Sequence, residues 1–390
     1  MKTQRFSEID SPVLTFAVSI GAAMAIMPLM VGPLLVGEYQ RTLGFSQPEA
    51  GSLLSAEMWG LTLGALLLLR LVHSNWQRLL WMAFICMVLG NAMAGLGSSY
   101  AALIIARGIV GLGAGIVMTL TMQVISMTRS PDTVYGIWSV GQILMGAVWL
   151  LIIPKLIAVV GLPGIFFAWA ACALLITLTI SHYPRGRQFV TNTPTEKRVG
   201  SKAILGWLCL LGMVIYYAGQ AGVWSFVEAV GIDKAIPLEA VQLSLMISLI
   251  AAIAGSAVAI MIGNTYGRAL PLSVSLCLSA LGLASLHYTS TDSAFLLAVC
   301  LFNFAWYLFL PYISAVVAAI DEAGTFLTLL SVAFPASLAA GPAIAALLLA
   351  HSGNLLAVLL FGFFSVPIGL ALMLPAARDS AKPQSTVNPL

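Results

Sequence analysis

Charged residues are scarce in this chain. Asp, Glu, Lys and Arg together make up 8% of its 390 residues, whereas hydrophobic residues make up 60%. In an ordinary soluble domain about a quarter of the residues are charged, so the composition excludes that class of protein. The mean hydropathy of +1.01 instead predicts a protein whose partner is the lipid bilayer.

Cysteine and histidine are also few, and neither type is clustered. The cysteines lie in apolar stretches without pairing or ligand spacing, which excludes a disulfide framework and gives no metal site. The phosphate-binding motif G-x-x-x-x-G-K-[ST] does not occur, so nucleotide hydrolysis is excluded as an energy source. The net charge of +3 follows membrane topology and does not indicate nucleic acid. We therefore expect no metal, no cofactor and no nucleic-acid partner.

Long apolar runs, in contrast, fill the chain. A run of roughly 20 apolar residues is long enough to cross a bilayer as a helix. The sequence predicts an all-α polytopic membrane protein with twelve such spans. Their approximate ranges are 13–36, 49–70, 78–97, 100–124, 134–159, 163–182, 203–229, 237–262, 269–287, 293–318, 323–350 and 354–376.

Basic residues predict the orientation, because cytoplasmic loops carry an excess of Lys and Arg. With a cytoplasmic N-terminus, most Lys and Arg residues fall on the cytoplasmic side. The opposite side then holds only Arg41, Lys155 and Lys234. We expect both termini to be cytoplasmic, and a multi-pass protein of the cell's inner (cytoplasmic) membrane.

The longest polar connection divides the chain into halves. It joins the sixth and seventh spans and is rich in Pro, Gly, Arg and Lys. We expect an N-terminal six-helix bundle at 1–182, a cytoplasmic linker at 183–202, a C-terminal six-helix bundle at 203–377 and a tail at 378–390. Parallel repeats of this kind place a substrate site between the halves.

Two local motifs strengthen this interpretation. Arg107-Gly108-Ile109-Val110-Gly111-Leu112-Gly113 in the fourth span and Asn264-Thr265-Tyr266-Gly267-Arg268 after the eighth resemble signatures of the major facilitator superfamily (MFS) of secondary transporters. The resemblance implies the MFS fold, transport by alternating access, and a monomer. The family's antiporter signature is missing, because the fifth span has Gly141-Gln142 and Gly146 but no Gly-Pro pair.

Two charges are expected inside the membrane. Glu57 lies near the middle of the second span and Arg107 lies about seven residues inside the fourth. An unpaired charge is costly there, so intramembrane ionisable groups indicate function by default. We expect proton coupling at Glu57 and Arg107. The alternative is a static ion pair that holds the two spans together.

Two further carboxylates mark the outer ends of spans. Glu38 follows the first span and Glu228 ends the seventh. Each is either a solvated helix end or a gating residue that meets a partner when the outer mouth closes. Gating is the functional hypothesis for both.

The second half has no charge at mid-membrane, so its polar and aromatic residues are the substrate candidates. Amide, phenol and indole groups provide hydrogen bonds and flat apolar area, which suit an aromatic or amphipathic solute. Ordinary packing between helices is the alternative. The candidates are Tyr216, Tyr217 and Gln220 in the seventh span, Asn303, Trp306 and Tyr307 in the tenth, and, more weakly, Gln142 in the fifth.

These features favour a proton-coupled secondary active transporter over other classes. The expected cargo is a small organic solute that is amphipathic, aromatic or anionic. A second hypothesis is a gradient-independent lipid or lysolipid translocator on the same fold. An intramembrane enzyme is the third, but its catalytic residues are not visible, because His73, His182, His287 and His351 lie at loops or span ends.

Overall fold

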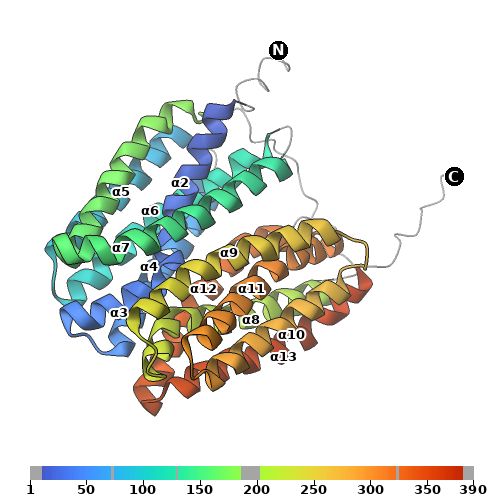
Figure 1. Ribbon diagram of the computed structural model, residues 1–390. Coiled ribbons are helices and arrows are strands. Elements are labelled where there is room, and N and C mark those ends of the chain that lie inside the picture. Colours follow the sequence, from blue (N-terminus) through green and yellow to red (C-terminus); the bar gives the residue numbers. More distant parts are fainter. Residues whose placement is uncertain (1–10, 72–73, 129–130, 186–202, 322–324, 381–390) are drawn as a thin grey trace.

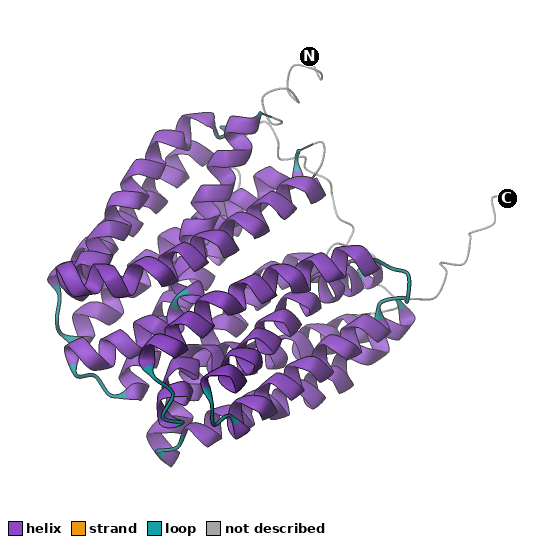
Figure 2. Cartoon of the chain, in the orientation of Figure 1, coloured by secondary structure: helices purple, strands orange, loops and turns teal. Residues whose placement is uncertain are grey.

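The computed structural model describes residues 11–71, 74–128, 131–185, 203–321 and 325–380. Most of the expected linker, the end of the expected tail and the N-terminal residues lie outside these ranges. The described residues form helices joined by short loops (Figure 2). The helices are α2 (Pro12–Met30), α3 (Gly32–Leu43), α4 (Gln47–Leu71), α5 (Trp76–Leu96), α6 (Tyr100–Ser126), α7 (Pro131–Ile176), η1 (Thr177–His182), α8 (Ala203–Asp233), α9 (Leu238–Ile262), α10 (Ala269–Tyr288), α11 (Asp292–Ile320), α12 (Thr325–Ser352) and α13 (Leu355–Asp379).

Within these ranges, 11 helical segments are long and apolar enough to cross a membrane. The sequence predicted twelve. The difference arises at the expected fifth and sixth spans, which form one segment of 49 residues, Val134–His182. That segment is interrupted at Gly161, whose φ of 69° and ψ of 177° are not helical. Glycine adopts a positive φ at little cost, so the chain turns here without a loop.

The first apolar run is also broken, at a pair of prolines. α2 ends at Met30 with Pro28 in its last turn, and α3 begins after Val31 with Pro33 at its start. Proline lacks the N–H that would continue the helical hydrogen bonds, and its ring disfavours the helix before it. The break frees backbone carbonyl groups in the middle of the protein.

The helix α4 starts with a capping box. The Ser46 backbone N–H and hydroxyl both donate to Glu49 Oε2, at 2.9 and 2.7 Å. The Glu49 N–H donates to Ser46 Oγ at 3.4 Å. These bonds satisfy backbone groups that a helix start leaves open.

The helices gather into two groups, shown blue to green and yellow to red in Figure 1. α2 to α7 pack on one another, and so do α8 to α13. The groups meet where α4 packs on α12, α7 on α9 and α3 on α8.

Glycines set the close packing of α4 on α6. A Cβ atom added at Gly111 or Gly115 would overlap the backbone carbonyl of Glu57 or Leu61, and one at Gly60 would overlap that of Gly108. Small residues allow membrane helices to approach this closely. The approach fixes the backbones of α4 and α6 next to each other, and with them the charged side chains at 57 and 107.

Candidate functional site

Glu57 of α4 and Arg107 of α6 form a buried ion pair. Arg107 Nε donates to Glu57 Oε2 at 3.0 Å, and its Nη2 donates to both carboxylate oxygens. The residues are 1% and 0% exposed. This two-pronged geometry suits an Arg–carboxylate pair, and it offsets part of the cost of removing both charges from water.

The rest of the Arg107 guanidinium is held by the same helix group. Its Nη1 donates to Asn91 Oδ1 at 2.9 Å, and Asn91 Nδ2 donates to the Met87 carbonyl at 2.8 Å. The Arg107 Cζ lies 5.3 Å from the ring centre of Phe166 and 5.6 Å from that of Trp169. Aromatic faces attract a cation at such distances. The pair is therefore internal to α2–α7 and does not reach the other group.

A second set of charges does connect the two groups. Arg41 of α3 donates from Nη1 to Glu228 Oε1 of α8 at 2.7 Å. Its Nη2 and Nε donate to Glu38 Oε1 at 2.7 and 3.1 Å. We call these three residues the α3–α8 ion cluster. Burial lowers the pKa of Arg41, but the carboxylates of Glu228 and Glu38 outweigh burial, and the pKa lies above its ordinary value. Arg41 therefore stays cationic and bridges the groups.

The carboxylate of Glu228 lies directly against the backbone of Gly37. A Cβ atom at Gly37 would overlap Glu228 Oε1, so only glycine at this position leaves room for the carboxylate. Glu228 is 1% exposed, and its Oε2 is buried without a hydrogen-bond partner. The expected gating residues thus share one cation, and the sequence alone did not identify it.

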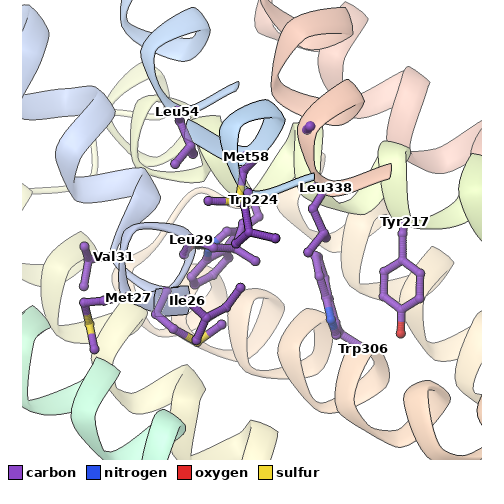
Figure 3. Close-up of a cluster of buried hydrophobic side chains, with 14 of the residues drawn as sticks. Ile26, Met27, Leu29, Val31, Leu54, Met58, Tyr217, Trp224, Trp306 and Leu338 are labelled. Atoms are coloured by element: carbon purple, nitrogen blue, oxygen red, sulfur yellow. Dashed lines mark hydrogen bonds between the residues drawn. The ribbon is translucent and has the colours of Figure 1, made fainter. Parts of the chain in front are cut away.

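A small cavity lies between the groups. It has a volume of about 10 Å³ and is lined by residues from α2, α8, α9 and α11, which is room for about one water molecule. Figure 3 shows the apolar side chains around this region. Asn303, Trp306 and Tyr307 are among the lining residues; the others are Leu29, Met30, Trp224 and Leu249.

Two hydrogen bonds cross between the groups at this cavity. The Tyr307 hydroxyl donates to Met30 Sδ at 3.5 Å. The Trp224 Nε1–H donates to the Leu29 carbonyl at 2.8 Å. In a continuous helix that carbonyl would accept from residue 33, but Pro33 has no N–H. Trp224 replaces the lost donor with one from the other half of the chain.

The other substrate candidates divide between two surroundings. Tyr217 is fully buried against Trp306, Phe309 and Phe334, and its hydroxyl has no hydrogen-bond partner. Asn303 Nδ2 donates to Ser248 Oγ at 2.9 Å. These residues come from α8, α9, α11 and α12, so they gather aromatic and amide groups on one side of the interface.

Tyr216 also packs on Tyr217 and Phe309, but its hydroxyl belongs to a hydrogen-bond network with Gln220. The Tyr216 hydroxyl donates to Ser279 Oγ at 3.4 Å, and Ser279 Oγ donates to Gln220 Oε1 at 2.9 Å. Gln220 Nε2 donates to the Gly362 carbonyl and to Ser365 Oγ, both at 3.4 Å. These bonds join α8 to α10 and α13 inside one group. Gln142 is buried on α7 and does not line the small cavity.

Sequence reasoning missed Arg41, Asn91 and Trp224. The sequence carried a signal for Trp224, because Pro33 predicts a free carbonyl four residues earlier. The sequence carried no such signal for Arg41, because nothing in it distinguishes this residue from the other basic residues expected on the outer side. Among the described residues no group of three or more His, Cys, Asp or Glu side chains is placed to hold a metal ion.

Comparisons with known proteins agree with this architecture. Residues 13–318 match the family model described as Major Facilitator Superfamily. No curated protein matches the sequence. Among solved structures, one similar chain is "Crystal structure of D-xylose-proton symporter", with a TM-score of 0.68 and 16% sequence identity. The match covers 97% of this chain and 99% of that one.

Proposed function

Because the chain belongs to the Major Facilitator Superfamily, and is therefore a multi-pass membrane transporter and not an enzyme, we propose that it moves a small organic solute by proton-coupled alternating access. The halves, residues 1–182 and 203–377, rock against each other around a site between them. In this proposal α7 comprises two spans that meet at Gly161, which gives twelve spans in all. In this arrangement the protein lies in the inner (cytoplasmic) membrane, and both of its termini face the cytoplasm.

The α3–α8 ion cluster is the observation that carries this proposal. It joins the two groups of helices at the ends of α3 and α8, where Arg41 meets Glu228 at 2.7 Å. Ser55 Oγ of α4 donates to the Ala339 carbonyl of α12 at 2.8 Å, which adds a second link between the groups. We assign the cluster as an outer gate, closed in this conformation. Glu38 and Glu228 are its carboxylates and Arg41 is the cation that they share.

Proton coupling is assigned to Glu57 and Arg107. The similar solved structure is titled a proton symporter, and a buried carboxylate beside a guanidinium can exchange its ion pair for a proton. Protonation of Glu57 would free Arg107 from its main partner, while the glycine contacts keep α4 on α6. We assign the coupling of proton movement to transport to this step, in which Glu57 exchanges Arg107 for a proton.

The solute is assigned to the interface. Tyr217, Asn303, Trp306 and Tyr307 lie at or beside the small cavity, where aromatic faces and one amide suit an amphipathic or aromatic molecule. The cavity's volume of about 10 Å³ excludes such a solute in the present conformation. We propose that the site enlarges when the halves rock.

Transport by the purified monomer in sealed vesicles tests this function. An imposed pH gradient should drive accumulation of an aromatic or amphipathic solute, with proton movement reported by a trapped pH dye. An uncoupler should abolish the accumulation. Solute movement that an uncoupler leaves unchanged would contradict proton coupling and favour the gradient-independent translocator.

A further inference from the structure

A second, larger cavity lies between α2 and α7, away from the ion pair and the ion cluster. Its volume is about 440 Å³, and ten residues line it, all from these two helices. α2 and α7 pack against each other in the same group of helices (Figure 1). Sites for small organic molecules commonly have volumes of about 300–1,000 Å³.

The wall of this cavity is almost entirely apolar. None of the lining residues is charged, and Thr15 and Ser19 supply the only side-chain hydroxyl groups among them. A wall of this kind offers no counter-ion to a carboxylate, a phosphate or an ammonium group. A charged group held against these apolar side chains would lose part of its hydration without gaining a partner, which is unfavourable.

Ser19 marks the polar position in this wall. The residue is 9% exposed, and its hydroxyl is buried without a hydrogen-bond partner. Serines elsewhere in the helices, such as Ser225 and Ser244, donate to the carbonyl four residues earlier. A buried polar group without a partner is rare in proteins. The hydroxyl oxygen is itself buried in this rotamer, but no hydrogen bond holds it there. A rotation about the Cα–Cβ bond of Ser19 would turn it toward a molecule bound in the cavity.

The large and the small cavity share one helix, α2, among their walls. Ser19, Ala23 and Met30 are four and seven residues apart, so they share one face of α2. Ser19 and Ala23 line the large cavity, whereas Met30 lines the small one and accepts the hydrogen bond of Tyr307. The two cavities lie along the same helix face.

From this geometry we infer that the α2–α7 cavity is a binding site for an uncharged amphipathic molecule. The apolar walls hold its body, and the Ser19 hydroxyl hydrogen-bonds its single polar group, such as an alcohol, a ketone or an amide. The occupant is taken to be the transported solute on its way to the interface, so this part of the inference rests on the proposed function. The inference narrows the solute class, because it excludes the anionic molecules that the sequence left open.

Two glycines of α7 provide a matched test. A Cβ atom at Gly141 or at Gly136 would meet no atom within 4 Å, so both positions accept a side chain without a clash. Gly141 lines the cavity and Gly136 does not. Gly141→Leu therefore fills the cavity, while Gly136→Leu makes the same chemical change on the same helix outside it.

The probes are naphthol and naphthoate, which share a ring system and differ in charge at neutral pH. Binding is measured on the purified protein by the rise in thermal stability, since a ligand of the folded state raises it. We expect naphthol to bind the wild type and Gly136→Leu equally, and naphthoate to bind at least about tenfold more weakly. Gly141→Leu should lose naphthol binding. Ser19→Ala should weaken it about fivefold, whereas Ser273→Ala on α10 should leave it unchanged.

Each result decides the matter. No naphthol binding to the wild type, equal binding by Gly141→Leu and Gly136→Leu, or naphthoate binding as tight as that of naphthol would overturn the site or its ligand class. Flux is measured separately with the same proteins in sealed vesicles. Binding that follows the expected pattern without any flux would support the site while contradicting the transport proposal.

Discussion

Arg41 and Glu228 lie 187 positions apart in the chain, yet their side chains meet at 2.7 Å and join the two groups of helices. Neither group contains both residues. The ion pair therefore forms only when α3 and α8 are together, and any motion that separates the outer ends of the halves must break it. This dependence makes the pair a direct test of the gating proposal.

Glu228→Gln should favour the conformation in which the outer ends are apart. The amide keeps the volume of the side chain but removes the charge that Arg41 binds. The Arg41 side chain is 34% exposed and keeps Glu38 as a second partner. The closed state should therefore lose about one charge-assisted hydrogen bond, worth about 1.5–3 kcal/mol. With spin labels at Leu43 and Ile232, the fraction of molecules at the longer label–label distance should be at least about tenfold larger than in the wild type.

Glu239→Gln is the control for this measurement. Glu239 is exposed at the start of α9, so its replacement should leave the distance distribution as in the wild type. An unchanged distribution in Glu228→Gln would show that the ion pair does not hold the gate.

Gly37→Ala, a change on α3, should break the same Arg41–Glu228 ion pair. The added Cβ would overlap Glu228 Oε1, so the carboxylate must leave Arg41. Combined with Glu228→Gln, the substitution should add little, because both remove one interaction. Gly108→Ala, where a Cβ meets nothing within 4 Å, serves as the control. Fully additive effects in the double variant would contradict a shared contact.

Glu57→Gln should abolish accumulation driven by a pH gradient while solute exchange continues. The amide still accepts from Arg107 but takes up no proton. Glu49→Gln on the same helix is a suitable control, because Gln also serves at this position of a capping box. Accumulation that keeps its full pH dependence would remove Glu57 from the coupling mechanism.

The stability of Glu57→Gln needs its own comparison. The single substitution leaves the buried Arg107 without a counter-ion, at a cost of about 3–5 kcal/mol. The double variant Glu57→Gln with Arg107→Gln removes both charges and should recover most of the thermal stability. It should remain uncoupled, which separates loss of coupling from loss of folding.

Trp224→Phe should destabilise the contact between the halves. It removes the indole N–H that donates to the Leu29 carbonyl, and a lost hydrogen bond of this kind costs about 0.5–1.5 kcal/mol. Adding Pro33→Ala supplies the backbone N–H that the helix lacks and should recover part of this loss. Thermal unfolding in detergent measures both effects. Trp207→Phe, at a side chain that is 59% exposed, is the control, and an equal loss there would argue against the hydrogen bond.

The sequence predicted the helices because their signals are local. Apolar runs, the Ser46–Glu49 capping box and the prolines at 28 and 33 each act within a few residues. The separation of the fifth and sixth spans was harder to see in the structure, since Gly161 turns the chain without a loop. The pairing of Glu57 with Arg107 was among the expectations because two charges in so apolar a region have few partners.

The contacts between the halves were beyond sequence reasoning. Arg41 lies on the outer side with other basic residues, and only its position opposite Glu228 distinguishes it. Tyr216 and Gln220 were grouped with Tyr217 because they are close in sequence. On a helix, neighbouring residues point in different directions, and these two bond to α10 and α13 instead.

The bond from Trp224 to Leu29 has a consequence for how this contact withstands mutation. Its acceptor is a backbone carbonyl, which every amino acid at position 29 would supply. This hydrogen bond therefore depends on the residues at positions 33 and 224, whereas position 29 is restricted by its packing at the small cavity. A comparison of natural variants should find that the proline and the indole change together.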